Sequence, residues 1–170
     1  MNLIQEDNFF PELDYLLPQI KHTKLYTQEE TRKILKTDNV NWPGKRSLPL
    51  NEVNPILHEF IKCLINEKNL LERGNWRIAS FLHLRLEGDN EKDWIHTDED
   101  DLAALIYLSN TNLNSGTNLY DKNDNLINDV KFVKNRFVMY TGCTRHMGYG
   151  HHGNSIENGR LTINLFLNRA

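Results

Sequence analysis

Hydrophobic and polar positions divide the chain into a front part with helical spacing and a back part with strand-like alternation. Across residues 51–72 the apolar positions recur at intervals of three and four, which predicts one long amphipathic helix ending before Gly74. Thr27 and Glu30 have the spacing of a capping box and predict a shorter helix after Thr27. We therefore expect residues 1–75 to form a helical support.

From residue 76 onward, short apolar or alternating runs are separated by turn-type residues. The candidate strands are 76–86, 101–108, 118–120, 130–133, 136–140 and 160–167. The predicted turns include 112–116, 121–129 and 148–153. Many short strands at such spacing favour a sandwich or barrel over a βαβ sheet. The expected class is mainly β with flanking helices, and no glycine-rich nucleotide-binding motif is present.

Composition narrows the class of protein further. The chain has 170 residues, 39% of them hydrophobic, which predicts a single domain over 1–170 with its own core. A net charge of −3 argues against a general nucleic-acid or anionic-membrane binder. Two cysteines make no disulfide framework, and neither a secretory leader nor an apolar run of about 20 residues is visible. We expect a cytoplasmic protein.

A possible metal site begins at His96 and Asp98. On an extended strand, residues two apart point to the same face, so both side chains could reach one metal ion. A third ligand, His146, comes shortly after the alternating run 136–140. Two histidines and one carboxylate form the facial triad that suits Fe(II) and leaves positions open. Arg160, at the start of the last apolar strand, could pair with a carboxylate near that triad.

Two further histidines compete with His146 for the third ligand position. His151 and His152 lie in a glycine-flanked loop and do not directly follow a strand, which favours His146. Three loops are candidates for lining the mouth of the site. They are 42–47, 89–94 and 148–154.

Residues 76–168 resemble the Fe(II)/2-oxoglutarate-dependent oxygenase superfamily, and more narrowly its small prolyl-hydroxylase-like branch. Within them, the stretch HMGYGHHGNSIENGRLT at 146–162 is similar to an oxygenase family found in bacteria and phages. The stretch WPGKRS at 42–47 is also similar to that family. The resemblance implies a double-stranded β-helix, which is a jelly roll of the cupin-like type, backed by N-terminal helices.

The resemblance also implies roles for single residues. His96, Asp98 and His146 match the iron ligands of the family. Arg160 matches the residue that pairs with the C5 carboxylate of 2-oxoglutarate, and Thr162 lies two positions further on the same strand face. Tyr107 matches a strand tyrosine that donates to the same carboxylate.

The sequence departs from the family pattern at two positions. Ser115 replaces the first glycine of a Gly-Gly-Thr turn. Leu86 stands where the family often has a tyrosine, about ten residues before the first histidine ligand. His83 or Arg85 could compensate for that missing tyrosine.

The implied activity is that of an Fe(II)- and 2-oxoglutarate-dependent dioxygenase that uses O₂ and releases succinate and CO₂. It would hydroxylate a C–H bond of a small molecule or of an amino-acid or prolyl residue. Two alternatives stay open at this point. One is an inactive jelly-roll module that binds metal or acts as a sensor, and the other is a cupin-type metalloenzyme that does not use 2-oxoglutarate.

Overall fold

The computed structural model describes residues 3–38, 40–89, 93–150 and 152–170. The helices are α1 (Leu13–Lys21), α2 (Gln28–Leu35), α3 (Leu50–Val53) and α4 (Pro55–Glu67). The strands of the front part are β1 (Ile4–Glu6) and β2 (Lys45–Arg46). The remaining strands are β3 (Trp76–Arg85), β4 (Leu102–Tyr107), β5 (Asn112–Tyr120), β6 (Leu126–Phe132), β7 (Phe137–Thr141), β8 (Arg145–Tyr149) and β9 (Arg160–Arg169).

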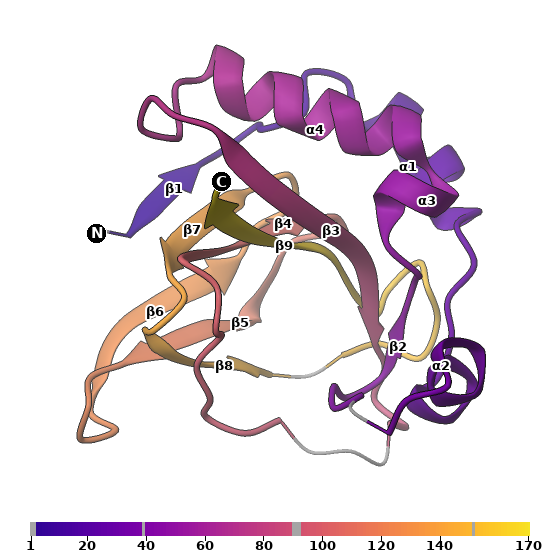
Figure 1. Ribbon diagram of the computed structural model, residues 1–170. Coiled ribbons are helices and arrows are strands. Elements are labelled where there is room, and N and C mark those ends of the chain that lie inside the picture. Colours follow the sequence, from indigo (N-terminus) through magenta and orange to yellow (C-terminus); the bar gives the residue numbers. More distant parts are fainter. Residues whose placement is uncertain (1–2, 39, 90–92, 151) are drawn as a thin grey trace.

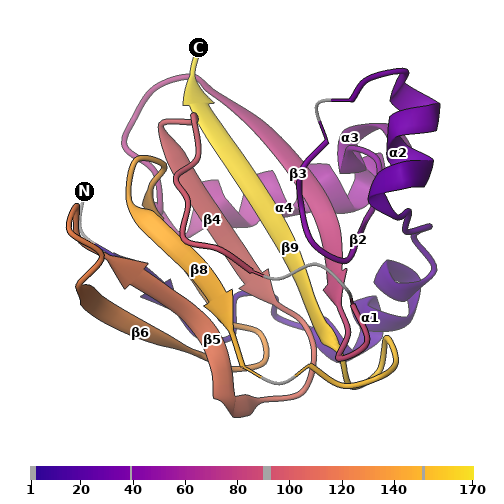
Figure 2. The same cartoon turned by 90° about the horizontal axis from the view of Figure 1, so that it is seen from below.

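These strands form two sheets. The larger has six strands in the order β1-β7-β4-β9-β3-β2, and the smaller has three in the order β6-β5-β8. Neighbouring strands are antiparallel throughout both sheets. The small sheet lies against one face of the large sheet, and the helices α1, α3 and α4 lie on the other side (Figures 1 and 2). This arrangement confirms the predicted mainly β class with flanking helices.

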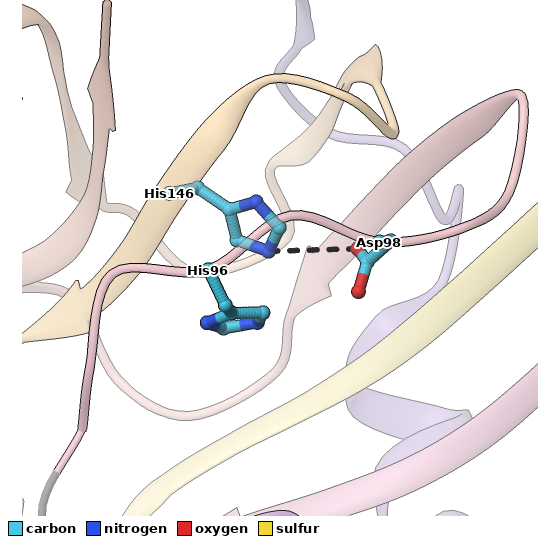
Figure 3. A group of neighbouring side chains, drawn as sticks. All are labelled: His96, Asp98 and His146. Carbon is cyan, nitrogen blue, oxygen red and sulfur yellow. Dashed lines mark ion pairs between the residues drawn. The ribbon is translucent and has the colours of Figure 1, made fainter. Parts of the chain in front are cut away.

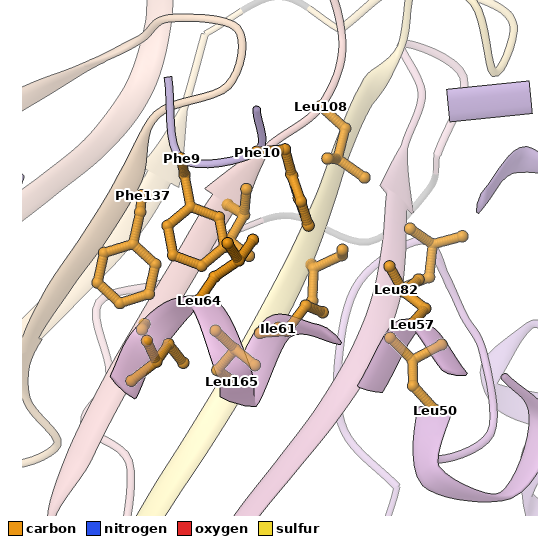
Figure 4. Packing of buried hydrophobic residues seen from close by; sticks show 14 of the residues in the cluster. Phe9, Phe10, Leu50, Leu57, Ile61, Leu64, Leu82, Leu108, Phe137 and Leu165 are labelled. Carbon is orange, nitrogen blue, oxygen red and sulfur yellow. The ribbon is translucent and has the colours of Figure 1, made fainter. Parts of the chain in front are cut away.

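The main core lies between the helices and the large sheet. Apolar residues of α4, such as Ile61 and Leu64, pack with Leu82 of β3 and Leu165 of β9 (Figure 4). The alternating sequence of strand β9 gives the strand two different faces. Its leucine and isoleucine side chains at alternate positions join this core, so the residues between them face the small sheet. Those residues are Arg160, Thr162, Asn164 and Phe166.

A second, smaller core lies between the two sheets. It consists of buried side chains from β4, β5, β6 and β7, namely Ala103, Leu105, Tyr107, Leu119, Val130, Phe132, Val138 and Tyr140. Three members of this cluster, Ala103, Leu105 and Tyr140, also line a cavity. Arg160, Asn164 and Phe166 of β9 line the same cavity.

The prediction of one helix over residues 51–72 was wrong. The structure has the short helix α3 and then α4, with a break at Asn54. Pro55 begins α4 because its missing N–H is harmless in a first turn, and the Asn54 side chain accepts a hydrogen bond from the Leu57 N–H. Helix α4 ends at Glu67, and Asn69 with a positive φ of 53° turns the chain before Gly74 is reached.

The capping box of Thr27 and Glu30 at α2 is confirmed.

Several elements carry no clear sequence signal. Helix α1 and the strands β1 and β8 were not predicted, and β1 and β2 extend the large sheet from within the supposedly helical front part. Strands β5 and β6 are longer than predicted, since they include residues 112–116 and 126–129 that were expected in turns. Shifts of register in the β5–β6 pair accommodate the turn-like composition. Among the described residues, no helix is long and apolar enough to cross a membrane.

Candidate active site

The three predicted metal ligands lie together at the edge of the small sheet. His96, Asp98 and His146 each offer a ligand atom, and these atoms all lie within 4.8 Å of one another (Figure 3). His146 Nε2 lies 3.5 Å from Asp98 Oδ2, and the two imidazole ring centroids are 4.3 Å apart. Neighbouring ligands at right angles on one ion, with bonds of about 2.1 Å, are separated by about 3 Å. The His146–Asp98 distance is therefore within about 0.5 Å of the spacing that two ligands take around one metal ion.

The backbone brings these ligands together although no regular strand covers residues 96–98. His96 forms an isolated bridge with His146 on β8, with reciprocal N–H to O=C hydrogen bonds of 3.0 and 2.8 Å. The Asp98 N–H donates to the Gly142 carbonyl at 2.9 Å. The expected extended strand is thus only a short bridged segment. It still directs both side chains to the same side.

Each imidazole is oriented by its own backbone. His96 Nδ1 lies 2.9 Å from the Trp94 carbonyl oxygen, and His146 Nδ1 lies 2.9 Å from the Thr144 carbonyl oxygen. A carbonyl can only accept, so Nδ1 carries the proton in both rings. The Nε2 atoms are then free to bind a cation, as is usual for histidine ligands held by an outer hydrogen bond.

Burial shifts the pKa values of His146 and Asp98 in directions that favour the binding of a cation. Desolvation, with a smaller contribution from His96, lowers the pKa of His146 to about 4, so its imidazole is neutral at pH 7. Burial also raises the pKa of Asp98, which means that its carboxylate is poorly solvated. A divalent cation would bind the neutral imidazole and offset the desolvation of the carboxylate.

The cluster opens into a cavity of about 440 Å³ between the polar face of β9, the small-sheet edge and the front part of the chain. Arg160 lies in its wall and is only 8% exposed. The Arg160 Nη2 donates to the Thr117 hydroxyl at 3.1 Å and, more weakly, to the Gly116 carbonyl at 3.4 Å. Its Nε is buried without a hydrogen-bond partner among the described residues. Arg160 therefore has unused hydrogen-bonding capacity in the wall of the cavity that the metal cluster also lines.

The structure places Tyr107 and Thr162 behind the cavity wall, and both are completely buried. The Tyr107 hydroxyl donates to the Thr117 hydroxyl at 2.8 Å, and the Arg160 guanidinium lies 5.7 Å from the Tyr107 ring centroid. The Thr162 hydroxyl donates to Asn164 Oδ1 at 2.7 Å. Thr117 and Asn164 are the cavity-lining partners of these two residues. Sequence reasoning gave neither of them a role, although Thr117 stands in the recognised turn motif.

His83 and Arg85, the two residues considered as substitutes for a tyrosine at Leu86, both line the cavity. The Nε2–H of His83 donates to the Pro43 carbonyl at 2.6 Å, and burial holds the pKa of His83 well below its usual value. Arg85 is paired with two carboxylates, Asp89 at 3.2 Å and Asp93 at 3.3 Å. The cavity therefore contains a neutral imidazole and a compensated guanidinium at this end.

The 42–47 loop contributes directly to the cavity wall. Trp42, Pro43 and Arg46 all line the cavity. The Arg46 guanidinium carbon lies 4.5 Å from the Trp42 ring centroid. Burial lowers the pKa of Arg46 to about 10, and the Asp98 carboxylate partly opposes that shift, so Arg46 is charged at pH 7.

The other proposed loops meet the cavity in part. Asp93, Trp94 and Gly148 line it, whereas residues 90–92 and 151 fall outside the described part of the chain. His151, one competitor for the third ligand, is therefore not placed. His152 is buried and has its Nε2 3.9 Å from Asp93 Oδ2. Within the described residues, His146 is the third member of the ligand cluster.

No protein-family model and no curated protein sequence matches this chain. Solved structures do match. A prolyl-4-hydroxylase from Pseudomonas putida is 14% identical, with a TM-score of 0.61 over 99% of this chain and 92% of that one. HygX from Streptomyces hygroscopicus, solved with nickel, 2-oxoglutarate and hygromycin B bound, is 10% identical, with a TM-score of 0.69 over 99% of this chain and 83% of that one.

A prolyl hydroxylase from Trichoplax adhaerens, in complex with a peptide fragment of hypoxia inducible factor, is 11% identical. Its TM-score is 0.61, and the match covers 98% of this chain and 83% of that one. At these identities the likeness concerns the fold. The chain has the jelly-roll fold of the prolyl hydroxylases and 2OG-Fe(II) oxygenases, as the sequence resemblance implied.

Proposed function

We propose that this protein is an Fe(II)- and 2-oxoglutarate-dependent dioxygenase that hydroxylates a C–H bond of a small molecule or of an amino-acid or prolyl residue. The observation that carries the proposal is the convergence of two features in one cavity. His96, Asp98 and His146 form a two-histidine, one-carboxylate cluster, and the buried Arg160 lies in the same wall. The first feature suits iron and the second suits a dicarboxylic cosubstrate.

The donor set fits a first-row divalent metal. Both imidazoles have Nε2 free because Nδ1 is hydrogen-bonded to a backbone carbonyl, and Asp98 supplies a carboxylate oxygen. Three protein ligands on one side leave the other positions to small molecules. The donors contain no thiolate, which argues against a structural zinc site of the usual cysteine-rich type.

The surroundings of Arg160 fit the distal carboxylate of 2-oxoglutarate. Its buried Nε has no partner among the described residues, so a carboxylate would satisfy an otherwise uncompensated donor. The Thr117 hydroxyl accepts hydrogen bonds from Tyr107 and from Arg160, which occupies its two lone pairs. Its own proton then has to point elsewhere, and a carboxylate oxygen between Thr117 and Arg160 would accept it.

In this proposal Tyr107 and Thr162 act through their neighbours. Tyr107 fixes the Thr117 hydroxyl, and Thr162 fixes the Asn164 side chain. With Fe(II) and 2-oxoglutarate bound, O₂ is used to oxidise the cosubstrate to succinate and CO₂ while one oxygen atom enters a substrate C–H bond. The protein's part is to hold the ligands on one side and to keep the cosubstrate oriented.

The two alternatives receive less support from the same features. A cupin-type enzyme that does not use 2-oxoglutarate has no use for a buried guanidinium beside the metal cluster. A module that only binds metal has no use for one either, and leaving Arg160 buried with an unpartnered Nε carries a free-energy cost. A carboxylate cosubstrate accounts for both the location and the burial of Arg160.

The test has a binding arm and a turnover arm. Under anaerobic conditions, Fe(II) and 2-oxoglutarate together are expected to give a weak visible absorption band, and O₂ should then yield succinate. Arg160→Gln should still bind the metal but bind 2-oxoglutarate about tenfold to a hundredfold more weakly, since a charge-assisted hydrogen bond contributes about 1.5–3 kcal/mol. The matched control is Arg77→Gln, which removes an exposed arginine from the same sheet.

Two results would contradict the proposal. One is wild-type protein that binds Fe(II) but forms no succinate from 2-oxoglutarate, even when candidate substrates are added. The other is an Arg160→Gln variant whose affinity for 2-oxoglutarate equals that of Arg77→Gln.

A further inference from the structure

Arg46 lines the cavity but has no part in the proposed binding of the metal or of the cosubstrate. Its backbone is fixed on both sides, because β2 pairs with β3 at His83 and because Arg46 and Tyr26 exchange backbone hydrogen bonds of 2.9 Å. The side chain reaches into the same cavity as the metal cluster. Arg46 is therefore held in place before any ligand binds.

The Arg46 guanidinium sits in a cage of aromatic rings. Its central carbon lies 4.5 Å from the Trp42 ring centroid, 5.5 Å from that of Phe81 and 5.7 Å from that of Phe166. Rings of this kind attract the planar faces of a guanidinium and leave its N–H edges free. Those edges match a planar group that accepts two parallel hydrogen bonds, as a carboxylate does.

Among the residues that the structure describes, no carboxylate is ion-paired with Arg46, and its buried Nε has no hydrogen-bond partner. The other two arginines of the cavity differ in this respect. Arg85 is paired with Asp89 and Asp93, and Arg160 is assigned to 2-oxoglutarate by the proposed function. Asp98, whose charge acts on Arg46, belongs to the metal cluster. One buried positive charge therefore remains without a dedicated counter-ion.

We propose that Arg46 binds the carboxylate of the substrate, and that the substrate is a small organic acid with an apolar portion lying against the aromatic wall. This inference rests on the proposed function for the identity of the reaction, but it concerns a different residue and a different ligand. The apolar portion follows from Trp42 and Phe166, which line the cavity beside Arg46.

Two other chemistries fit the site less well. A phosphate group carries nearly two negative charges near pH 7 and would need a second cation, whereas the nearby Arg85 is already compensated. A neutral peptide segment would leave the guanidinium buried and unpaired, which costs free energy. The cavity of about 440 Å³ also has to hold the metal and the cosubstrate, which favours a small acid.

The experiment compares acids with their own amides on protein loaded with Zn(II) and saturated with 2-oxoglutarate, so that no turnover occurs. The probes are L-proline and L-prolinamide, L-leucine and L-leucinamide, and 3-phenylpropionate and 3-phenylpropanamide. Binding is measured by saturation-transfer NMR and by calorimetry. At least one acid is expected to bind about tenfold more tightly than its amide, because one charge-assisted pair is lost in the amide.

Substitutions assign that difference to Arg46. Arg46→Gln should remove the preference for the acid, and Arg46→Met, which keeps much of the buried stem, should do the same if the glutamine variant folds poorly. Arg46→Lys should keep part of the preference. Lys45→Gln, which removes the exposed neighbouring charge, should keep all of it. Melting temperatures of all variants show which of them are folded.

The inference is overturned if no acid in the panel binds more tightly than its amide, or if a folded Arg46 variant keeps the preference. Failure of the proposed function would look different, since the wild-type protein would then form no succinate or would bind 2-oxoglutarate independently of Arg160. In that case the acid and amide pairs are compared on the Zn(II) protein with Arg160→Gln as background. A preference that depends on Arg46 would still support this inference.

Discussion

His96 and His146 hold each other in place through two reciprocal backbone hydrogen bonds, although 50 positions separate them in the sequence. Their ring centroids lie 4.3 Å apart on the side that faces Asp98. Because this pairing uses only backbone atoms, both imidazole side chains remain available to bind a metal ion. Removing one imidazole therefore should not remove the support for the other.

His96→Ala is expected to abolish tight binding of Fe(II) or Co(II) while leaving the fold intact. The reason is that the variant loses one of the three proposed ligands but keeps both backbone hydrogen bonds to His146. Metal titration followed by the absorption of Co(II) measures the loss, and thermal melting of the metal-free protein measures the fold. His22→Ala, which removes an exposed histidine, is the control. Equal metal affinity in the two variants would show that His96 is not a ligand.

Gly142→Ala is expected to weaken metal binding about tenfold to a hundredfold without touching any ligand, which is the usual effect of disturbing the outer support of a metal site. A Cβ on Gly142 would stand 1.9 Å from the Asp100 carbonyl oxygen, so the backbone that carries Asp98 must move. Gly142 also accepts the Asp98 N–H. Metal titration checks this result, and Gly88→Ala, where a Cβ would meet nothing within 4 Å, serves as control.

Thr117→Val is expected to weaken 2-oxoglutarate binding more than Thr162→Val does. The first substitution removes a hydroxyl that Arg160 and Tyr107 both use, and it leaves the buried Tyr107 hydroxyl unpaired at a cost of about 1–3 kcal/mol. The second removes a hydroxyl that donates to Asn164. The two variants are compared by their dissociation constants for 2-oxoglutarate, measured anaerobically on metal-loaded protein. A larger loss in Thr162→Val would mean that Thr162 contacts the cosubstrate directly.

The metal-free protein is expected to lose stability as the pH falls from about 6.5 to 4. Burial lowers the pKa of His83 and lowers that of His146 to about 4, so the unfolded chain takes up protons first. The stabilisation is complete above the unfolded pKa of about 6.5, and His146 alone accounts for up to about 3 kcal/mol of the loss. The raised pKa of Asp98 acts in the opposite direction near the acidic end.

Urea unfolding at several pH values measures this dependence, and His83→Gln tests its origin. Glutamine can still donate a hydrogen bond toward Pro43 but does not titrate, so the decline in the free energy of unfolding should become shallower. His22→Gln, which removes an exposed histidine, is the control. A His83→Gln slope identical to that of wild type would assign the acid sensitivity to other groups.

Local sequence patterns determined those features whose physical cause is local. The capping box of Thr27 and Glu30 begins α2 as predicted, because the two side chains satisfy N–H groups within one turn. The alternation in β9 separates a core face from a polar face, because side chains on a strand alternate in direction. The same alternation predicted that Arg160 and Thr162 share a side. Asn54 and Pro55 show the limit, since apolar spacing alone continued the helix across them.

The tertiary structure decided which distant residues meet. Strand β8 has few apolar residues and exists because β5 pairs with it on one side and His96 bridges it on the other. Thr117 and Arg46 come to the cavity only through sheet register and through the edge position of β2. The sequence by itself determined the residue types of the proposed metal site and their order along the chain. Only the packing of two sheets determined the cavity and its unpaired charge, because strand pairing over long sequence distances depends on the whole fold.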